Sequence, residues 1–337
     1  MTISAPGSKV IHAARKPRIL PFDTGRSLPF RRPRPVPEVI PLQSRKSVLY
    51  IIVTAFCFGT MEVALKIGGS SFAPLQMNFL RFLIGGVVLL PLALREKRRR
   101  GLTLDRGDLG YLTLLALVGV CLSMSCFQFG VMGLNANTAS VMISSNPVFT
   151  MIFAYFLVHE PFTRRKALVL ILCVIGLVLV ANPMHMAEGN TVKGMVYMSV
   201  ALVTFALFTA LGKLRSARLG GTIQTCFTFL IASVFNLIIL LVSRSPIVSG
   251  LSLQSLPVLL YCGLVVTGLG YFSYLSAIEL AGPSNASIAF FLKPVIAVTA
   301  AALILKEPVT PNIVAGVALI LIGSFLNLRK AKPAADS

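Results

Sequence analysis

Ten apolar runs, each long enough to cross a lipid bilayer as a helix, occupy almost all of this sequence beyond residue 46. A helix needs about 20 predominantly apolar residues to span the hydrocarbon core. The breaks between the runs contain glycine, proline, asparagine or charged residues, which are typical of turns. The pattern predicts an all-α integral membrane protein with ten transmembrane helices. Their expected bounds are 47–67, 74–94, 108–131, 136–158, 166–182, 193–213, 221–242, 254–278, 284–305 and 310–328.

The composition excludes a soluble fold. Only 12% of the residues are charged and 55% are hydrophobic, whereas a soluble domain has about 25% charged residues to cover its surface. All six cysteines lie inside apolar runs and none forms a CxxC pair, so we interpret them as core residues rather than disulfides or metal ligands. The sequence therefore predicts neither a metal site nor a cofactor.

Basic residues gather at the N-terminus and in short loops. Residues 1–46 are rich in proline and hold ten Lys or Arg against two acidic residues, out of a net charge of +20. We interpret 1–46 as a disordered cytoplasmic tail and 331–337 as a short C-terminal tail. This clustering is typical of the cytoplasmic flanks of a membrane protein and does not favour nucleic-acid binding.

The distribution of Lys and Arg also predicts the orientation in the membrane. If both termini are cytoplasmic, the basic loops 95–107, 159–166 and 213–221 all lie on the cytoplasmic side. The opposite loops then hold only the four cations Lys66, Lys193, Arg244 and Lys306. We expect a multi-pass protein of the plasma or inner membrane, with the lipid bilayer as its surroundings. The sequence does not decide between a monomer and a homodimer.

An internal repeat organises the chain. Displaced by 147 residues, the stretch 135–180 matches 282–327 without gaps at 12 of 46 positions, including proline, Glu-Pro and glycine in register. We therefore expect two five-helix repeats, 47–190 and 191–330. Five crossings are an odd number, so the second repeat enters the membrane from the opposite side. Inverted repeats of this kind are a common plan of secondary transporters, which open alternately to each face.

Two motifs stand near the start of the first repeat: the stretch 58–66 (FGTMEVALK), and Pro74 followed by 79–82 (FLRF). Together with the repeat, they resemble the opening motifs of the drug/metabolite transporter superfamily, EamA-like branch. The resemblance covers about 47–330 and implies a secondary transporter of a small metabolite or drug, with export the commoner direction. This chain departs from the family pattern by having no Trp and by placing Glu62 where members often carry a neutral Asn.

Lys293 lies deepest in the apolar spans, and its repeat-related counterpart is Asn146. A charge in hydrocarbon needs a partner or a water-filled cavity. Each of the two residues precedes a proline, Pro147 or Pro294, which removes a helix hydrogen bond, so we expect kinks or hinges beside a central cavity. The alternative is that Lys293 pairs with a neighbouring carbonyl or carboxylate and serves only packing.

Glu62 and Arg81 are the other charges deep in the spans, and two readings of them remain open. Glu62 and Lys66 are spaced i,i+4 on one helix face and can pair directly, so Glu62, Lys66 and Arg81 could form a structural ion cluster. Alternatively, Glu62 takes up and releases a proton and couples transport to the proton gradient. Burial of a carboxylate favours its protonated form, whereas neighbouring cations favour its charged form.

The function expected from these residues is secondary active transport of a small organic solute. The predicted substrate-binding residues are Lys293, Asn146, Arg81, Phe58, Phe205, Gln128 and Tyr274, and their cationic members favour a carboxylate-bearing substrate such as an amino acid. No His or Asp lies deep in a span and no GxxxxGK[ST] stretch occurs, so neither an intramembrane enzyme nor an ATP-driven pump is expected. A passive channel or facilitator remains the alternative. Glu160 and Glu307, beside prolines in both repeats, are expected to serve structure as helix caps or hydrogen-bonded turns.

Overall fold

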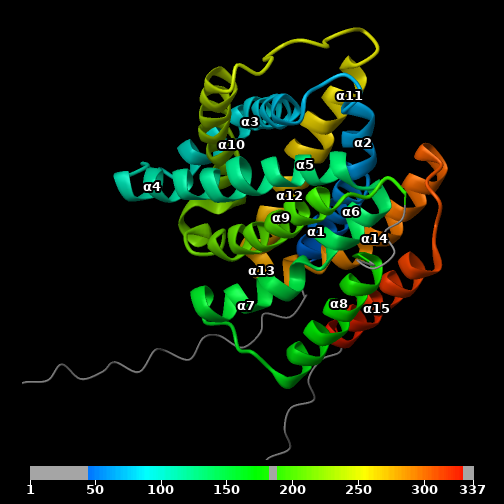
Figure 1. Cartoon of the computed structure of the whole chain (residues 1–337). Coiled ribbons are helices and arrows are strands. Elements are labelled where there is room, and N and C mark those ends of the chain that lie inside the picture. The colour runs from blue at the N-terminus through cyan, green and yellow to red at the C-terminus, as the bar shows by residue number, and fades with distance from the viewer. Residues whose placement is uncertain (1–44, 182–187, 329–337) are drawn as a thin grey trace, which may run out of the picture. The chain divides into compact units, whose positions relative to one another are not determined.

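A computed structural model describes residues 45–181 and 188–328, and all regular elements in these ranges are helices (Figure 1). Eight of them, some assembled from consecutive segments, are long and apolar enough to cross a membrane. Shorter apolar stretches, Ala167–Val180 and Pro311–Gly323, occupy the fifth and tenth expected spans. The two tails predicted from the sequence fall outside the described residues, apart from 45 and 46. The all-helical membrane fold predicted from the sequence is confirmed.

The first repeat follows the expected apolar runs, with several spans divided into segments. Its elements are α1 (Arg45–Gly59), α2 (Met61–Gly68), α3 (Pro74–Arg99), α4 (Arg106–Leu115), the π-helix η1 (Ala116–Met124), α5 (Ser125–Gly133), α6 (Ala136–Ser144), α7 (Asn146–Val158) and α8 (Arg164–Ala181). The first span divides at Thr60, whose hydroxyl bonds to the carbonyls of Phe56 and Cys57 and to the hydroxyl of Tyr261.

The second repeat has the same order of spans. Its elements are α9 (Val192–Leu211), α10 (Ser216–Val242), α11 (Leu256–Leu260), the π-helix η2 (Tyr261–Leu269), α12 (Gly270–Ala281), α13 (Pro283–Ala286), α14 (Ala289–Ala300), the π-helix η3 (Ala301–Leu305) and α15 (Pro311–Leu328). The π-helices η1 and η2 recur in the third span of each repeat. Such wide turns often occur beside functional sites.

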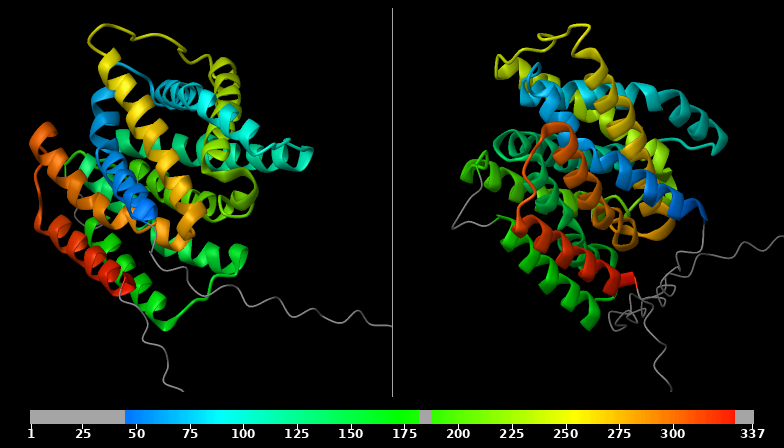
Figure 2. Two further views of the ribbon diagram at one scale, coloured as in Figure 1. Left: turned by 180° about the vertical axis from the view of Figure 1, so that it is seen from behind. Right: turned by 90° about the vertical axis from the view of Figure 1, so that its right-hand side faces the viewer.

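Repeat-related helices pack against each other in two places. Helix α3 packs along α10, and α8 packs along α15, as Figures 1 and 2 show for the green and red pair. Small residues allow the second contact, since a Cβ added at Gly176 would lie 3.0 Å from the carbonyl oxygen of Gly316. Close approach of this kind is a common way for helices to associate in lipid. Each pair joins the two repeats.

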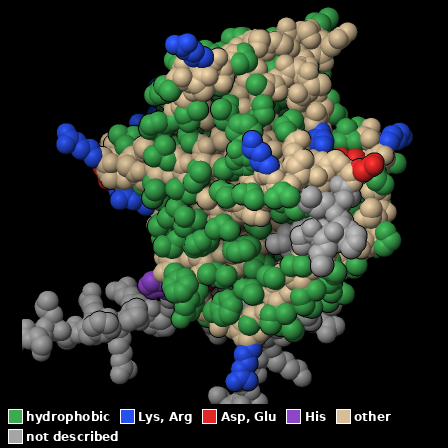
Figure 3. Space-filling model, viewed as in Figure 1, with side chains coloured by type: hydrophobic (Ala, Val, Ile, Leu, Met, Phe, Trp, Pro, Cys, Tyr) green, Lys and Arg blue, Asp and Glu red, His purple; other side chains and the backbone are tan. Residues whose placement is uncertain are grey.

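The surface matches a protein surrounded by lipid. Hydrophobic side chains cover most of the face in Figure 3, and Lys and Arg appear at scattered points. Many large apolar residues of the described helices are exposed, including Phe156 at 67% and Val234 at 60%. In water a contiguous surface of this kind would drive association, whereas in a bilayer it contacts lipid chains.

Candidate functional site

Glu62 and Lys293 form an ion pair in the centre of the described helices. Glu62 lies on α2 and Lys293 on α14, so the pair joins the two repeats across 231 residues of sequence. Both side chains are completely buried. The Oε2 atom of Glu62 has no hydrogen-bond partner among the described residues. A buried carboxylate with one open acceptor could therefore bind a further donor.

The i,i+4 pairing of Glu62 with Lys66 is not what the structure contains. Lys293 takes the position beside the Glu62 carboxylate because α14 packs against α2. Lys66, one helical turn further along α2, interacts electrostatically with Glu307 instead. The i,i+4 spacing places Lys66 near Glu62 along the helix, but the packing of α14 places Lys293 against the Glu62 carboxylate instead.

The repeat-related position holds neutral residues. Thr209 stands where Glu62 does in the first repeat, and its hydroxyl bonds to that of Tyr274 at 2.9 Å. Asn146 stands where Lys293 does, and its Oδ1 accepts a hydrogen bond from Thr150 at 2.9 Å. The Nδ2 atom of Asn146 has no partner in the described part of the chain. Of the two repeat-related pairs of positions, Glu62 with Lys293 is charged and Thr209 with Asn146 is neutral.

A cluster of aromatic rings lies beside the Glu62–Lys293 ion pair. The Phe58 ring centroid lies 4.9 Å from that of Tyr271 and 5.8 Å from those of Tyr274 and Phe290. Phe205 contacts the same three rings at 5.7–6.0 Å. Phe58, Phe205 and Tyr274 were predicted from the sequence, and the structure brings them together.

Phe127 and Phe290 also belong to this centre and were not among the predicted site residues. The Lys293 ammonium lies 5.7 Å from the Phe127 ring centroid and 5.8 Å from that of Phe290. The hydroxyl of Tyr271 donates a hydrogen bond to the sulfur of Met124 at 2.7 Å, exactly one repeat length earlier in the chain. The repeat offset could have identified Phe127 as the counterpart of Tyr274, and Tyr271 as the counterpart of Met124.

Arg81 is completely buried and has no carboxylate partner among the described residues. Its guanidinium donates to the Oδ1 of Asn78 at 3.2 Å and contacts the sulfur of Met61 at 3.8 Å. It also lies 4.5 Å from the centroid of the Phe82 ring. Its Nε has no hydrogen-bond partner within 45–181 and 188–328. The expected ion pair between Arg81 and Glu62 is absent from this described set, although Tyr271 interacts electrostatically with both.

The remaining predicted site residues lie nearby or at helix breaks. Gln128 is buried beside Phe127 in the sequence, and neither atom of its amide has a described partner. The helix breaks at Ser145, directly before Asn146 and Pro147. In the second repeat the break lies at 287–288, and α14 continues without interruption through Pro294.

Glu160 and Glu307 both reach helix starts of the opposite repeat. The carboxylate of Glu307 accepts hydrogen bonds from the backbone N–H of Ala136 at 2.7 Å and of Asn137 at 3.0 Å, which caps α6. Glu160 accepts a hydrogen bond from the hydroxyl of Ser284, at the start of α13. Glu307 is thus a helix cap, one of the two structural roles expected, whereas Glu160 binds a side-chain hydroxyl at a helix start; each contact joins the two repeats.

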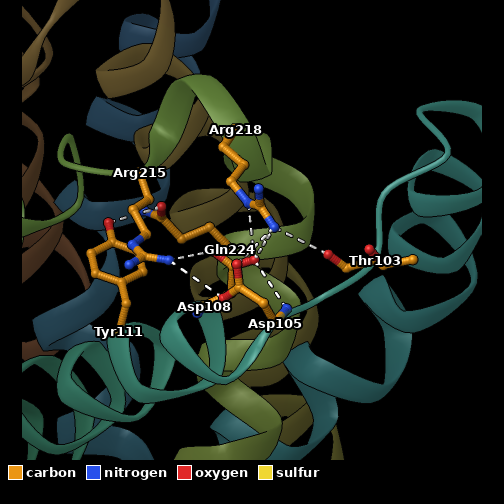
Figure 4. Close-up of polar contacts among 7 residues, drawn as sticks. All are labelled: Thr103, Asp105, Asp108, Tyr111, Arg215, Arg218 and Gln224. Carbon is orange, nitrogen blue, oxygen red and sulfur yellow. Dashed lines mark hydrogen bonds and ion pairs between the residues drawn. The ribbon is translucent and has the colours of Figure 1, made fainter. Parts of the chain in front are cut away.

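A second ionic cluster closes one end of the helices (Figure 4). The buried carboxylate of Asp108 accepts hydrogen bonds from Arg215 at 2.6 Å and from Arg218 at 3.0 Å. Asp105 caps α4 by accepting the N–H of Asp108 and also pairs with Arg218. The hydroxyl of Tyr111 donates to the carbonyl of Leu211 at 2.8 Å. The cluster joins the start of α4 to that of α10, and both oxygens of Asp108 are paired, so we interpret it as structural.

Lys213 contributes to the same end of the molecule. Its ammonium donates to the backbone carbonyls of Ile278 at 3.2 Å and Glu279 at 2.8 Å. Burial lowers the pKa of Lys213, and the carboxylates of Glu279 and Glu160 act against this effect.

No group of three or more His, Cys, Asp or Glu side chains that could hold a metal occurs among the described residues.

Comparisons with known proteins agree with this architecture. The family described as "EamA-like transporter family" matches twice, at residues 45–182 and 192–329. An "Uncharacterized transporter" of Clostridium kluyveri is 36% identical over 298 residues, 87% of this chain and 96% of that protein. A "Probable terminal-alkyne amino-acid exporter" of Streptantibioticus cattleyicolor is 23% identical and covers 85% and 94% of the two chains. A solved crystal structure with 14% identity and a TM-score of 0.62, covering 83% of this chain and 96% of the other, shares the fold.

Proposed function

Because the chain belongs to the EamA-like transporter family, we propose that it is a secondary active transporter that exports a small carboxylate-bearing organic solute by alternating access. Family membership makes it a multi-pass membrane transporter rather than an enzyme. The solute and the coupling are inferred from the buried centre described above, and the export direction is inferred from the similarity to a relative named as an exporter.

The observation that carries the carboxylate assignment is the buried guanidinium of Arg81. A buried cation without a countercharge is unfavourable, so such residues are retained where they bind something. The planar guanidinium matches a carboxylate in geometry and forms strong charge-assisted hydrogen bonds with it. Its Nε has no partner among the described residues. A solute carboxylate would supply the missing negative charge.

A second open atom of the site favours an amino acid. The Oε2 of Glu62 has no described donor, although its Oε1 is paired with Lys293. A solute ammonium could bind Oε2 while its carboxylate binds Arg81, and Tyr271 interacts electrostatically with both side chains. The aromatic rings of Phe58 and Phe205 would contact the apolar part of the solute. The similarity to a relative named as an amino-acid exporter supports this assignment.

The burial of the centre supports alternating access over a passive channel. Glu62, Arg81 and Lys293 all have exposed fractions of 0%, so neither face has an open path to them. A solute can reach these residues only after the helices move. A channel would instead require a continuous path to both faces in its conducting state.

Proton coupling at Glu62 follows from the same open atom. A proton and a solute ammonium would compete for Oε2, so each would displace the other. Binding that is mutually exclusive leads to exchange, in which protons enter as the solute leaves. The proposal thus links export to the proton gradient through a single carboxylate.

Counterflow into proteoliposomes tests the substrate assignment. Purified protein is reconstituted, the vesicles are loaded with an unlabelled amino acid, and entry of the same labelled compound is measured, after a thermal-shift screen has selected the amino acid. We expect the free acid to exchange and its methyl ester and its decarboxylated amine to be inactive, because both lack the carboxylate that Arg81 requires. Equal exchange of acid and ester would contradict the assignment. Flux that never becomes concentrative under an imposed gradient would favour the channel.

A pH gradient tests the coupling. An acidic vesicle interior should drive uptake of the labelled solute by the wild type, because outward proton flow is exchanged for inward solute flow. In Glu62→Gln, which keeps the shape but cannot ionise, the gradient should have no effect while counterflow without a gradient persists. Glu188→Gln, an exposed loop carboxylate, is the matched control. An unchanged response to pH in Glu62→Gln would remove the coupling from this residue.

A further inference from the structure

Two carboxylates at opposite ends of the described helices contact the other repeat at equivalent positions, one through backbone N–H groups and one through a side-chain hydroxyl. Glu307 follows the ninth span and caps α6 of the first repeat through the N–H groups of Ala136 and Asn137. Glu160, one repeat length earlier, follows the fourth span and binds the hydroxyl of Ser284 in the second repeat. Each carboxylate thus holds the helix start that is equivalent to the one held by the other.

The backbone around the two glutamates is also equivalent. Each follows a residue in the left-handed conformation, His159 or Lys306, both with φ of 58°. The N–H of Glu160 donates to the carbonyl of Ala154, and the N–H of Glu307 donates to that of Ala301. The same turn therefore presents both carboxylates.

A repeat-related lysine accompanies each carboxylate. Lys66 interacts electrostatically with Glu307, and Lys213 interacts with Glu160. Helix α3 runs from one end to the other. Its N-terminus follows α2, which carries Lys66, and marks the Glu307 end. Beyond its C-terminus, Nη2 of Arg100 lies 3.7 Å from Oε1 of Glu279, which marks the Glu160 end. The backbone carbonyl of Glu279 in turn accepts a hydrogen bond from Lys213. At about 1.5 Å per residue, the 26 residues of α3 extend across the helical part of the molecule.

Both contacts are formed in the conformation described here, and the residues between them are fully buried. A solute can therefore enter only if the contact at one end is released. The two contacts are made by equivalent residues of inverted repeats, which are related by a pseudo-two-fold axis. The motion that opens one end is therefore related by the same axis to the motion that opens the other. Release of both at once would produce a leak.

We propose that Glu307 and Glu160 are the two end closures of the transport cycle, each holding its own end shut while the other is open. This inference rests on the proposed function only in its use of alternating access, and it does not depend on the identity of the solute. It assigns a role in transport to residues that contact neither Glu62 nor Arg81.

Labelling of buried cysteines tests the closures without any solute. In a background with the six native cysteines replaced, Ala301→Cys and Ala154→Cys introduce reporters at equivalent positions. Both positions are 0% exposed, and their backbone carbonyls accept the N–H of Glu307 and of Glu160 respectively. The reaction rate of each reporter with a maleimide is measured in detergent, where both ends are in contact with the reagent. Glu307 and Glu160 are each changed to Gln and to Ala.

The expected result is a selective and graded increase. Glu307→Ala should raise the reaction rate of the 301 reporter by about tenfold, as expected for loss of a charge-assisted hydrogen bond, and leave the 154 reporter unchanged or slower. Glu307→Gln should give an intermediate rate, because one amide oxygen can still accept a hydrogen bond. Glu160→Ala and Ser284→Ala should show the mirror pattern, with a faster 154 reporter.

Two carboxylates outside the contacts serve as controls. Glu188 is exposed in the loop that precedes α9, and Glu96 pairs with Arg100 at the end of α3. Neither Glu188→Gln nor Glu96→Gln should change the reaction rate of either reporter. If both reporters accelerate together in Glu307→Ala, the residue only stabilises the fold and the proposal is overturned. Unchanged rates in all variants would overturn it equally. A chain that fails the counterflow test but shows the selective pattern would disprove the proposed solute and keep the closures.

Discussion

Replacing Lys293 by Met is expected to abolish transport and to lower the thermal stability of the protein, whereas adding Glu62→Gln should restore the stability but not the transport. Removal of one member of a buried ion pair leaves an uncompensated charge and costs about 3–5 kcal/mol. Neutralising both members removes that penalty, since a well-packed neutral pair is often as stable as the ion pair that it replaces. Counterflow stays lost because the Lys293 ammonium itself is needed.

The measurement is a thermal melt of the four proteins of this double-mutant cycle in one detergent, with counterflow measured on the same samples. Lys193→Met provides the control, since it removes an exposed lysine outside the centre and should change neither quantity. A double variant no more stable than the single variants would show that Glu62 and Lys293 do not depend on each other. Counterflow by Lys293→Met at the wild-type rate would exclude this lysine from the transport cycle.

The sequence predicted those features that depend on local pattern or on repetition. Apolar runs marked the spans to within a few residues, and the offset of 147 residues identified the two repeats. The same offset singled out Glu160 and Glu307 as structural residues. Repetition could not reveal that each glutamate crosses to the other repeat, because a sequence alignment pairs equivalent positions and does not indicate which of them touch.

Contacts between distant spans were the part that the sequence could not predict. The i,i+4 rule offered Lys66 to Glu62, yet Lys293 binds it from 231 residues away, because helix packing decides which side chains face each other in the interior. The π-helices η1 and η2 were also beyond prediction, because apolar residues lie on all sides of these spans and give no helical periodicity to interrupt.

Arg81 is expected to respond to neutralisation in the opposite sense to Lys293. Lys293 has a buried partner, so its removal leaves the buried carboxylate of Glu62 unpaired. Arg81 has no carboxylate partner among the described residues, so its removal leaves no buried carboxylate unpaired. Taking a single charge out of water into the protein interior costs several kcal/mol, and an apolar side chain of similar length avoids that cost. Arg81→Met should therefore melt at a higher temperature than the wild type.

The same substitution should remove solute binding. Loss of a buried charge-assisted contact to a carboxylate weakens affinity by about 100-fold or more, whereas Arg81→Lys keeps the charge without the planar fork and should lose less. Binding of the selected amino acid by calorimetry and melting of the same preparations provide the two readouts. A residue that merely packs the helices would lose stability and keep its affinity, so that pattern in Arg81→Met would exclude the guanidinium as the solute anchor. The opposite pattern, higher stability with lost binding, is what a site that keeps a charge unpaired for its substrate must produce.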